Sequence, residues 1–203
     1  MKILFCIVIM LSIATPSAAL DQKLAGQVLA EMNLARTKPN VYAGFIRELR
    51  GRFHGKTYSL PGSTIRVQTS EGISAVDEAI RFLSRQPPLK PLTWSKGLAA
   101  AAAELATEQE GSGATGHGKQ SRGLQERIER HGTWRGQIGE NIGYGPKEPR
   151  DMVMQLIIDD GVPNRGHRKN IFNPAFNTAG IAWGLHPRFG NMCVIDFAGG
   201  FSE

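Results

Sequence analysis

The residues of this chain that are best suited to chemistry are two histidines and three carboxylates in short polar segments. They are His117 in Gly-His-Gly, Glu140 in Gly-Glu-Asn, the pair Asp159-Asp160, and His167 in Arg-Gly-His-Arg. Two imidazoles and a carboxylate form a ligand set that zinc accepts while one coordination position stays open for water. Water bound to such an ion can lose a proton near neutral pH and become a nucleophile. These residue types therefore fit a site for zinc or another divalent metal.

The spacing of these residues gives such a site no independent support. His117, Glu140 and His167 lie more than twenty residues apart, and no His-Glu-x-x-His segment places two ligands on one helix face. Each histidine could equally bond a turn carbonyl, and Glu140 could hold backbone amides or a basic neighbour. On composition and spacing alone, this structural interpretation is favoured over a metal or catalytic site.

The acidic pair lies where negative charge is unusual. An apolar stripe in residues 153–157 predicts a helix, and the pair follows at its C-terminus, where the macrodipole opposes carboxylates. Asp160 continues the stripe and is expected to point inward, with Asp159 to one side. A salt bridge from the pair to Arg165 or Arg168 explains this position as well as metal binding does.

Other kinds of chemistry find less support in the sequence. The basic run Arg165, Arg168 and Lys169 could hold a phosphate or a carboxylate, but such a run is more typical of a solvated surface. Cys193 lies in an apolar segment, which indicates an inert, buried thiol. The sequence contains no Gly-x-Ser-x-Gly segment, phosphate-binding loop or paired-cysteine metal site.

The elements that must position these residues are helices in the first part of the chain and strands at its end. Apolar residues at three- and four-residue spacing predict helices in residues 21–35, 39–50, 73–83, 95–106, 124–128 and 149–157. Residues 50–70 read as an ordered loop. Residues 89–94 read as extended, 137–144 as a short strand, and 179–185 and 192–197 as a hairpin joined through 187–190. Helices followed by strands, without strict alternation, predict an α+β fold.

The first 19 residues have the pattern of a cleaved signal peptide. Lys2 precedes a short apolar run, and Ser17 and Ala19 suit a cleavage after Ala19. Residues 20–203 are then expected to form a single domain with no transmembrane segment, in a secreted or periplasmic protein. Cys6 leaves with the leader, so Cys193 has no partner for an internal disulfide.

The chain is mildly basic, with a formal net charge of +6. This charge would favour loose association with anionic envelopes or acidic polymers, and it also favours solubility. No basic stripe interleaved with aromatic residues and no nucleic-acid-binding motif accompanies it. We therefore expect no nucleic-acid partner.

Three motifs in order resemble a known family. They are Gly139-Glu-Asn-Ile142, Gly166-His-Arg-Lys-Asn-Ile171 and Ala179-Gly-Ile-Ala-Trp-Gly184. Together they resemble the CAP superfamily of cysteine-rich secretory proteins, antigen 5 and pathogenesis-related proteins. The likeness extends over residues 24–201 and is greatest to the disulfide-free branch found in bacteria and other microbes. It implies an exported α-β-α sandwich with a central antiparallel sheet and an open cleft.

The resemblance also implies a cleft tetrad of two histidines and two acidic residues that can bind zinc or a similar divalent ion. His117, Glu140 and His167 match three of its positions. The fourth position is a glutamate in relatives with a full tetrad, and here Asp159 or Asp160 stands in its place. The cysteine pairs and the Gly-His-Phe-Thr-Gln form of eukaryotic relatives are absent, so sterol-binding or toxin activities transfer poorly.

Two functions follow as hypotheses. The first is a secreted binding or interaction protein whose cleft holds a lipid, glycan or peptide. The alternative is a metal-dependent extracellular hydrolase of peptidase type, in which a histidine or carboxylate acts as general base toward a bound water. A third interpretation is a structural hydrogen-bond network around a vestigial site.

Overall fold

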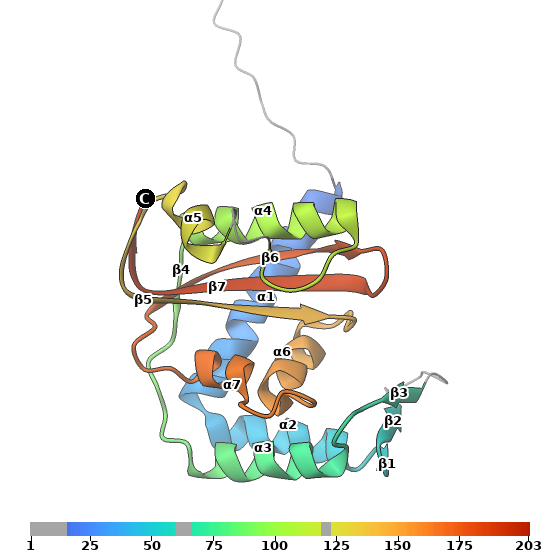
Figure 1. Ribbon diagram of the computed structural model, residues 1–203. Coiled ribbons are helices and arrows are strands. Elements are labelled where there is room, and N and C mark those ends of the chain that lie inside the picture. Colours follow the sequence, from blue (N-terminus) through green and yellow to red (C-terminus); the bar gives the residue numbers. More distant parts are fainter. Residues whose placement is uncertain (1–15, 60–65, 119–122) are drawn as a thin grey trace, which may run out of the picture.

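The structure is a computed structural model that describes residues 16–59, 66–118 and 123–203 (Figure 1). The predicted signal peptide lies outside the described residues except for its last four, which begin the first helix. The helices are α1 (Pro16–Thr37), α2 (Pro39–Arg50), α3 (Ile73–Arg85), α4 (Lys96–Ser112), α5 (Leu124–Glu129), α6 (Pro149–Ile158) and α7 (Gly166–Ile171). Among the described residues, no helix is long and apolar enough to cross a membrane.

The central sheet combines strands from the second half of the chain with one short strand from the first half. Its order is β4-β6-β7-β5, formed by β4 (Thr93–Trp94), β6 (Thr178–His186), β7 (Gly190–Ser202) and β5 (Thr133–Tyr144). β5 and β6 are antiparallel to β7, whereas β4 is a short parallel addition to β6. The predicted hairpin of β6 and β7 is confirmed. β5 forms one edge of this sheet.

The sheet lies between two helical layers, as Figure 1 shows. α4 and α5 cover one face, while α1, α6 and α7 lie on the other, with α2 and α3 beyond them. The largest buried cluster lies between this second face and α1, α2, α3 and α6. Helices and a mostly antiparallel sheet confirm the α+β prediction. The layering is the α-β-α arrangement that the resemblance implies.

The alanine-rich sequence of α4 allows a close approach to the sheet. Its N-cap is Ser95, whose hydroxyl accepts a hydrogen bond from the Leu98 amide. A Cβ added to Gly180 of β6 would lie 1.9 Å from the backbone nitrogen of Ala99 in α4. Only glycine permits this contact, so Gly180 sets the spacing between α4 and the sheet.

The prediction of a loop at residues 50–70 was wrong in part. Within its described residues the chain forms a small antiparallel sheet of β1 (Phe53–His54), β2 (Thr57–Ser59) and β3 (Arg66–Gln68). The rings of Phe53 and Tyr58 stack with their centroids 4.8 Å apart. Scattered apolar residues in strands of two or three residues leave too short an alternation for a sequence pattern to reveal.

Other bounds also differ from expectation, among them the start of β5, which lies at Thr133 and not at residue 137. α1 begins at Pro16, before the predicted start of this helix at residue 21. Proline suits the first turn of a helix because its missing amide would be unpaired there. α7 was not predicted, because Ile171 is the single apolar residue in its six and gives no periodic pattern.

Candidate functional site

The first pair of predicted site residues meets on the α4–α5 side of β5. Glu140 lies in the buried part of β5, with Ile138 and Ile142 on the same face packed against α4 and α5. Its Oε1 is 2.7 Å from Nδ1 of His117, which lies in the loop after α4. The Glu140 side chain is 2% exposed and that of His117 is 63% exposed, so the carboxylate is buried and the imidazole faces solvent.

Arg127 of α5 holds the other oxygen of Glu140. Its guanidinium forms an ion pair with Oε2, and both side chains are almost fully buried. Sequence reasoning missed Arg127, because its partner lies on a strand thirteen residues later. The bond to Glu140 raises the pKa of His117 above its ordinary value, and the desolvation of the ring opposes the shift. The pair therefore favours a protonated His117.

Asp196 lies beneath this pair on β7. It is opposite Glu140 of β5 and Gly180 of β6 in the strand register, and its side chain is fully buried. Neither of its carboxyl oxygens has a hydrogen-bond partner among the described residues. Burial raises the pKa of Asp196 well above its ordinary value, and the charge of Glu140 raises it further. These effects favour the neutral form of Asp196, while the charge of Arg127 acts in the opposite direction.

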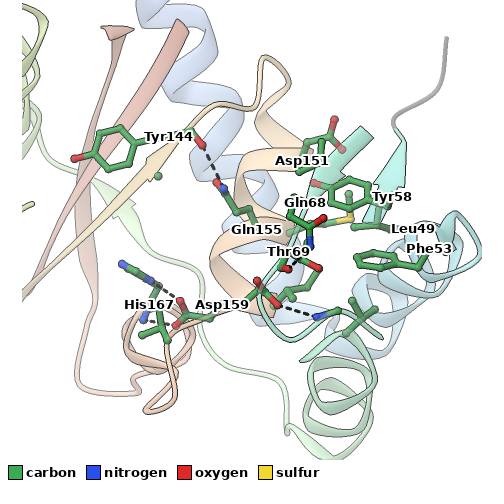
Figure 2. Close-up of a pocket in the computed structure, with 18 of the residues that line it drawn as sticks. Leu49, Phe53, Tyr58, Gln68, Thr69, Tyr144, Asp151, Gln155, Asp159 and His167 are labelled. Carbon is green, nitrogen blue, oxygen red and sulfur yellow. Dashed lines mark hydrogen bonds and ion pairs between the residues drawn. The ribbon is translucent and has the colours of Figure 1, made fainter. Parts of the chain in front are cut away.

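The second pair, Asp159 and His167, meets on the opposite face of the sheet. Asp159 is the C-cap of α6 and has a left-handed backbone with φ of 57°. This turn directs its carboxylate toward His167, whose Nδ1 lies 2.6 Å from Oδ1 and whose amide donates to Oδ2 at 2.9 Å. Figure 2 shows both contacts. Asp159 is buried, and the His167 side chain is 26% exposed.

Asp160 makes different contacts. Its two oxygens accept hydrogen bonds from the amides of Ser70, Glu71 and Gly72 at 2.6, 2.8 and 3.2 Å, just before α3. The expectation that Asp160 points inward and Asp159 to one side was wrong. α6 ends at Ile158, so helical spacing no longer applies to either residue.

The arginines of this segment pair with α3 and its N-terminal flank, and not with the side chains of the acidic pair. Arg165 contacts Glu71 at 2.6 Å and Glu78 at 2.6 Å, and Arg168 contacts Glu78 at 2.9 Å. Arg165 also donates to the backbone carbonyl of Asp159 at 2.8 Å. The bond from Arg165 lowers the pKa of Glu71 to about 2. These contacts attach the segment that carries His167 to α3.

Asparagine side chains join the two halves of the site across β5. Asn141 Nδ2 donates to the carbonyl of His167 at 2.9 Å, and Asn170 Nδ2 donates to the carbonyl of Glu140 at 3.1 Å. Because side chains alternate along a strand, Glu140 and Asn141 point to opposite faces. The two histidine–carboxylate pairs therefore lie on opposite faces of β5, which is an edge strand.

The contacts of the carboxylates bear on the predicted metal site. Glu140 and Asp159 each occupy Nδ1 of a histidine, which is the way that carboxylates orient metal-binding imidazoles without contacting the ion. Asp160 is bonded to backbone amides. Within the described ranges, no group of three or more His, Cys, Asp and Glu side chains could hold a metal ion. The donors that fit a metal are thus Nε2 of His117 and of His167, and metal binding stays a prediction.

A cavity of about 420 Å³ adjoins the second pair (Figure 2). His167 and Asp159 lie at one end, and Phe53 and Tyr58 of the small sheet lie at the other. Its walls come from α2, α3, α6 and the small sheet, with part of β5. The resemblance implies an open cleft, but the small sheet that forms one wall of this cavity was read as a loop.

Comparison with known proteins identifies the family. The model of the CAP family, the cysteine-rich secretory protein family, matches residues 29–197. This chain belongs to the CAP family. The resemblance inferred from its motifs is therefore confirmed. No curated protein matches this CAP chain.

Solved structures with a similar course of the chain come from three bacteria. An outer surface protein from Borrelia burgdorferi has a TM-score of 0.46 at 17% identity, covering 54% of this chain and 78% of its own. An extracellular SCP-domain protein from Bacillus anthracis has a TM-score of 0.44 at 20% identity, covering 62% and 37%. A cysteine-rich secretory protein from Staphylococcus aureus has a TM-score of 0.44 at 17% identity, and the match covers 70% of this chain and 46% of that protein. This chain thus spans less than half the length of the last two.

Proposed function

We propose that this CAP chain is an extracytoplasmic ligand-binding protein whose ligand occupies the cavity between the small sheet and α6. The observation that carries the proposal is the cavity itself, which has apolar walls and ends at the His167–Asp159 pair. Binding sites for small molecules are typically mostly apolar with a few polar groups that fix the orientation. The leader pattern in residues 1–19 and the family support an extracytoplasmic location. A lipid, a glycan or a peptide could each contact both the apolar walls and the polar His167–Asp159 pair.

The state of the thiol favours binding over covalent catalysis by cysteine. Cys193 lies on β7, is fully buried, and has a pKa that burial raises far above the ordinary range of a thiol. A thiol acts as a nucleophile through its thiolate, which this position disfavours. The cavity contains no cysteine among its described lining residues.

A divalent metal such as zinc would add a second means of holding the ligand. His167, which lines the cavity, would bind it through Nε2 with Asp159 fixing the ring, and His117 with Glu140 would have to reach the same ion from the other side of β5. The ion would supply a positive charge that polarises an oxygen of the ligand. Without a metal, Glu140 and Asp159 still orient the two imidazoles, and Phe53 and Tyr58 still line the apolar end of the cavity.

Chemical-shift mapping on the purified mature chain tests the proposal. The panel contains short alkyl lipids, oligosaccharides and apolar peptides, each added with and without zinc. We expect at least one class to perturb amides of β2, β3 and α6 saturably. A panel without any saturable shift at these elements, or with shifts confined to another surface, would contradict the proposal.

A metal-dependent hydrolase is a second candidate, favoured by the histidine–carboxylate pairs. A carboxylate on Nδ1 leaves the other ring nitrogen to accept a proton from a bound water, as a general base requires. Turnover of peptide or polysaccharide libraries that chelation and Glu140→Gln abolish would establish this activity. A lack of turnover with every added divalent ion would exclude it.

A further inference from the structure

The charge of the cavity differs from that of the chain as a whole. The chain has 24 basic and 18 acidic residues, a net charge of +6. The described residues that line the cavity nevertheless include three aspartates, Asp151, Asp159 and Asp160, and no lysine or arginine. Among these lining residues, the single ionisable group that can carry positive charge is His167. An acidic cavity in a basic protein selects against anionic ligands.

Two of the three aspartates are already satisfied by the protein. Asp159 accepts hydrogen bonds from the ring and the amide of His167, and Asp160 accepts three from the chain before α3. Their charges are therefore compensated by groups that the fold itself supplies. Asp151 remains, and its side chain makes no hydrogen bond or ion pair with any described residue.

Asp151 lies half-buried in the first turn of α6 and is one of the residues that line the cavity. Burial raises its pKa above the ordinary value, Glu148 raises it further, and Arg52 and Arg150 act in the opposite direction. Neither arginine forms an ion pair with it, and Arg150 instead pairs with Glu31 at 2.9 Å. A half-buried carboxylate that has no ion-pair partner is stabilised when a ligand brings a cation to it.

An aromatic surface accompanies this carboxylate. Tyr58 lies beside Asp151 in Figure 2, and its ring stacks on that of Phe53. The charge of Asp151, after burial, contributes to raising the pKa of Tyr58, which places the two groups within electrostatic reach of each other. An ammonium group is attracted both to a carboxylate and to the face of an aromatic ring. The two groups together favour a cation over a neutral head group.

The rest of the cavity suits an apolar body. Leu49, Val76, Met154 and Ile158 line it with hydrocarbon and thioether groups. Its volume of about 420 Å³ is within the range of sites for small organic molecules. A chain of roughly ten carbons would lose most of its contact with water here, which favours its binding.

We infer that the ligand of this cavity is a small cationic amphiphile, with an amine held by Asp151 and Tyr58 and an apolar chain along α2, α3 and α6. This inference rests on the proposed function and names the class of ligand. It excludes fatty acids and other anionic lipids as preferred ligands. The cation of the ligand supplies the partner that Asp151 lacks.

Calorimetric titration with three probes of equal chain length tests the inference. The probes are n-decylamine, n-decanol and sodium decanoate, each below its aggregation concentration, at pH 7. We expect decylamine to bind at least tenfold more tightly than decanol and decanoate. Asp151→Asn should weaken decylamine binding about tenfold and leave decanol binding unchanged. Asp77→Asn, a matched change at an ion-paired aspartate of α3 outside the cavity, should alter neither.

The outcomes separate this inference from the function on which it rests. Equal binding of the three probes, or a preference for decanoate, overturns the inference and leaves a ligand-binding cavity in place. An unchanged decylamine affinity in folded Asp151→Asn also overturns it. If none of the probes binds, while the wider panel of ligands still maps to the cavity, the inference again fails alone. If nothing maps to the cavity, both fail. The comparison of probes on the unaltered chain decides the matter even if a variant does not fold.

Discussion

At the scale of single residues, the site depends on carboxyl groups in three different environments. Glu140 shares its charge between Arg127 and His117, Asp159 is committed to His167, and Asp196 is buried with neither oxygen bonded to a described residue. The first two carboxylates are each paired with basic side chains, whereas burial favours the neutral form of the third. Glu140 and Asp196 lie opposite each other in the sheet, so a neutral Asp196 avoids repulsion between two neighbouring carboxylates.

Asp196→Asn tests the neutral state of this acid. Its pKa is raised on folding, so the folded protein binds a proton that the unfolded chain releases above about pH 4. The wild type therefore loses stability relative to the variant as pH rises from about 4 toward the raised pKa. We expect the advantage of the asparagine variant to grow with pH, by at most about 1.4 kcal/mol per pH unit. Urea unfolding at several pH values measures it, and a difference independent of pH would contradict the assignment.

His117→Gln tests the pairing of the exposed imidazole with Glu140. The pKa of His117 is raised on folding, so its protonated form adds stability that is fully present below about pH 6.5 and is lost as pH rises through the raised value. We expect the variant to be less stable than the wild type at pH 5.5, and the difference to shrink by pH 8.5. Unfolding in the presence of a chelator measures this.

His54→Gln is the matched control, because His54 is exposed on β1 and far from Glu140 in the sequence. It should not reproduce the effect of His117→Gln. A His117→Gln variant whose stability difference is the same at both pH values would show that the imidazole and Glu140 do not share a proton in solution.

At the scale of elements, the segment between α6 and α7 positions His167. Its backbone takes left-handed turns at two non-glycine residues, Asp159 and Arg165, with φ of 57° and 52°. Such turns persist where the surrounding contacts hold them. The contacts here are the ion pairs of Arg165 with Glu71 and Glu78 and the hydrogen bonds that the Asp160 carboxylate accepts from backbone amides before α3. The position of His167 therefore depends on α3 as well as on its own segment.

Glu71→Gln tests the attachment of this segment. The pKa of Glu71 is lowered to about 2, so its stabilising contribution is present above about pH 4.5 and is lost as pH falls toward 2. We expect the variant to lose about 1 kcal/mol or less at pH 7, because solvent screens this pair. The difference should shrink at pH 3. Glu110→Gln, at an exposed glutamate of α4, is the control and should show no such trend.

The sequence predicted the long elements well and the short ones poorly. α2, α3, α4 and α6 follow from apolar periodicity and from proline at their first positions or after their ends, and the β6–β7 hairpin follows from β-branched runs around Pro187. β1, β2 and β3 contain only two or three residues each, too few for an alternating apolar pattern to show in the sequence. α7 depends on Asn141 and Asn170 for its contacts with β5.

The candidate site was predictable as a set of residue types and not as a geometry. His117, Glu140 and His167 were found from their motifs, and the structure brings the first two together. The choice between Asp159 and Asp160 depended on where α6 ends and on one left-handed residue, which spacing does not specify. Arg127 and Asp196 were missed because each becomes significant only through its contact with Glu140 across the fold.

At the scale of the whole molecule, the two helical layers place one histidine–carboxylate pair on each side of an edge strand. The α4–α5 layer supplies His117 and Arg127, and the α6–α7 layer supplies Asp159 and His167. The small sheet of β1, β2 and β3 adds a wall to the second side and makes it a cavity. The proposed binding function therefore belongs to the α6–α7 side of β5.

Cavity filling tests this account most directly. Val67 of β3 lines the cavity, and tryptophan at this position would occupy much of its volume. Val41 of α2 is 51% exposed and does not line the cavity. Val41→Trp is therefore the matched control, because it makes the same change outside the cavity. The measurement is the calorimetric affinity of the tightest ligand from the panel for the wild type and both variants. The account predicts at least a tenfold loss for Val67→Trp and none for Val41→Trp, whereas an unchanged affinity in a folded Val67→Trp would contradict it.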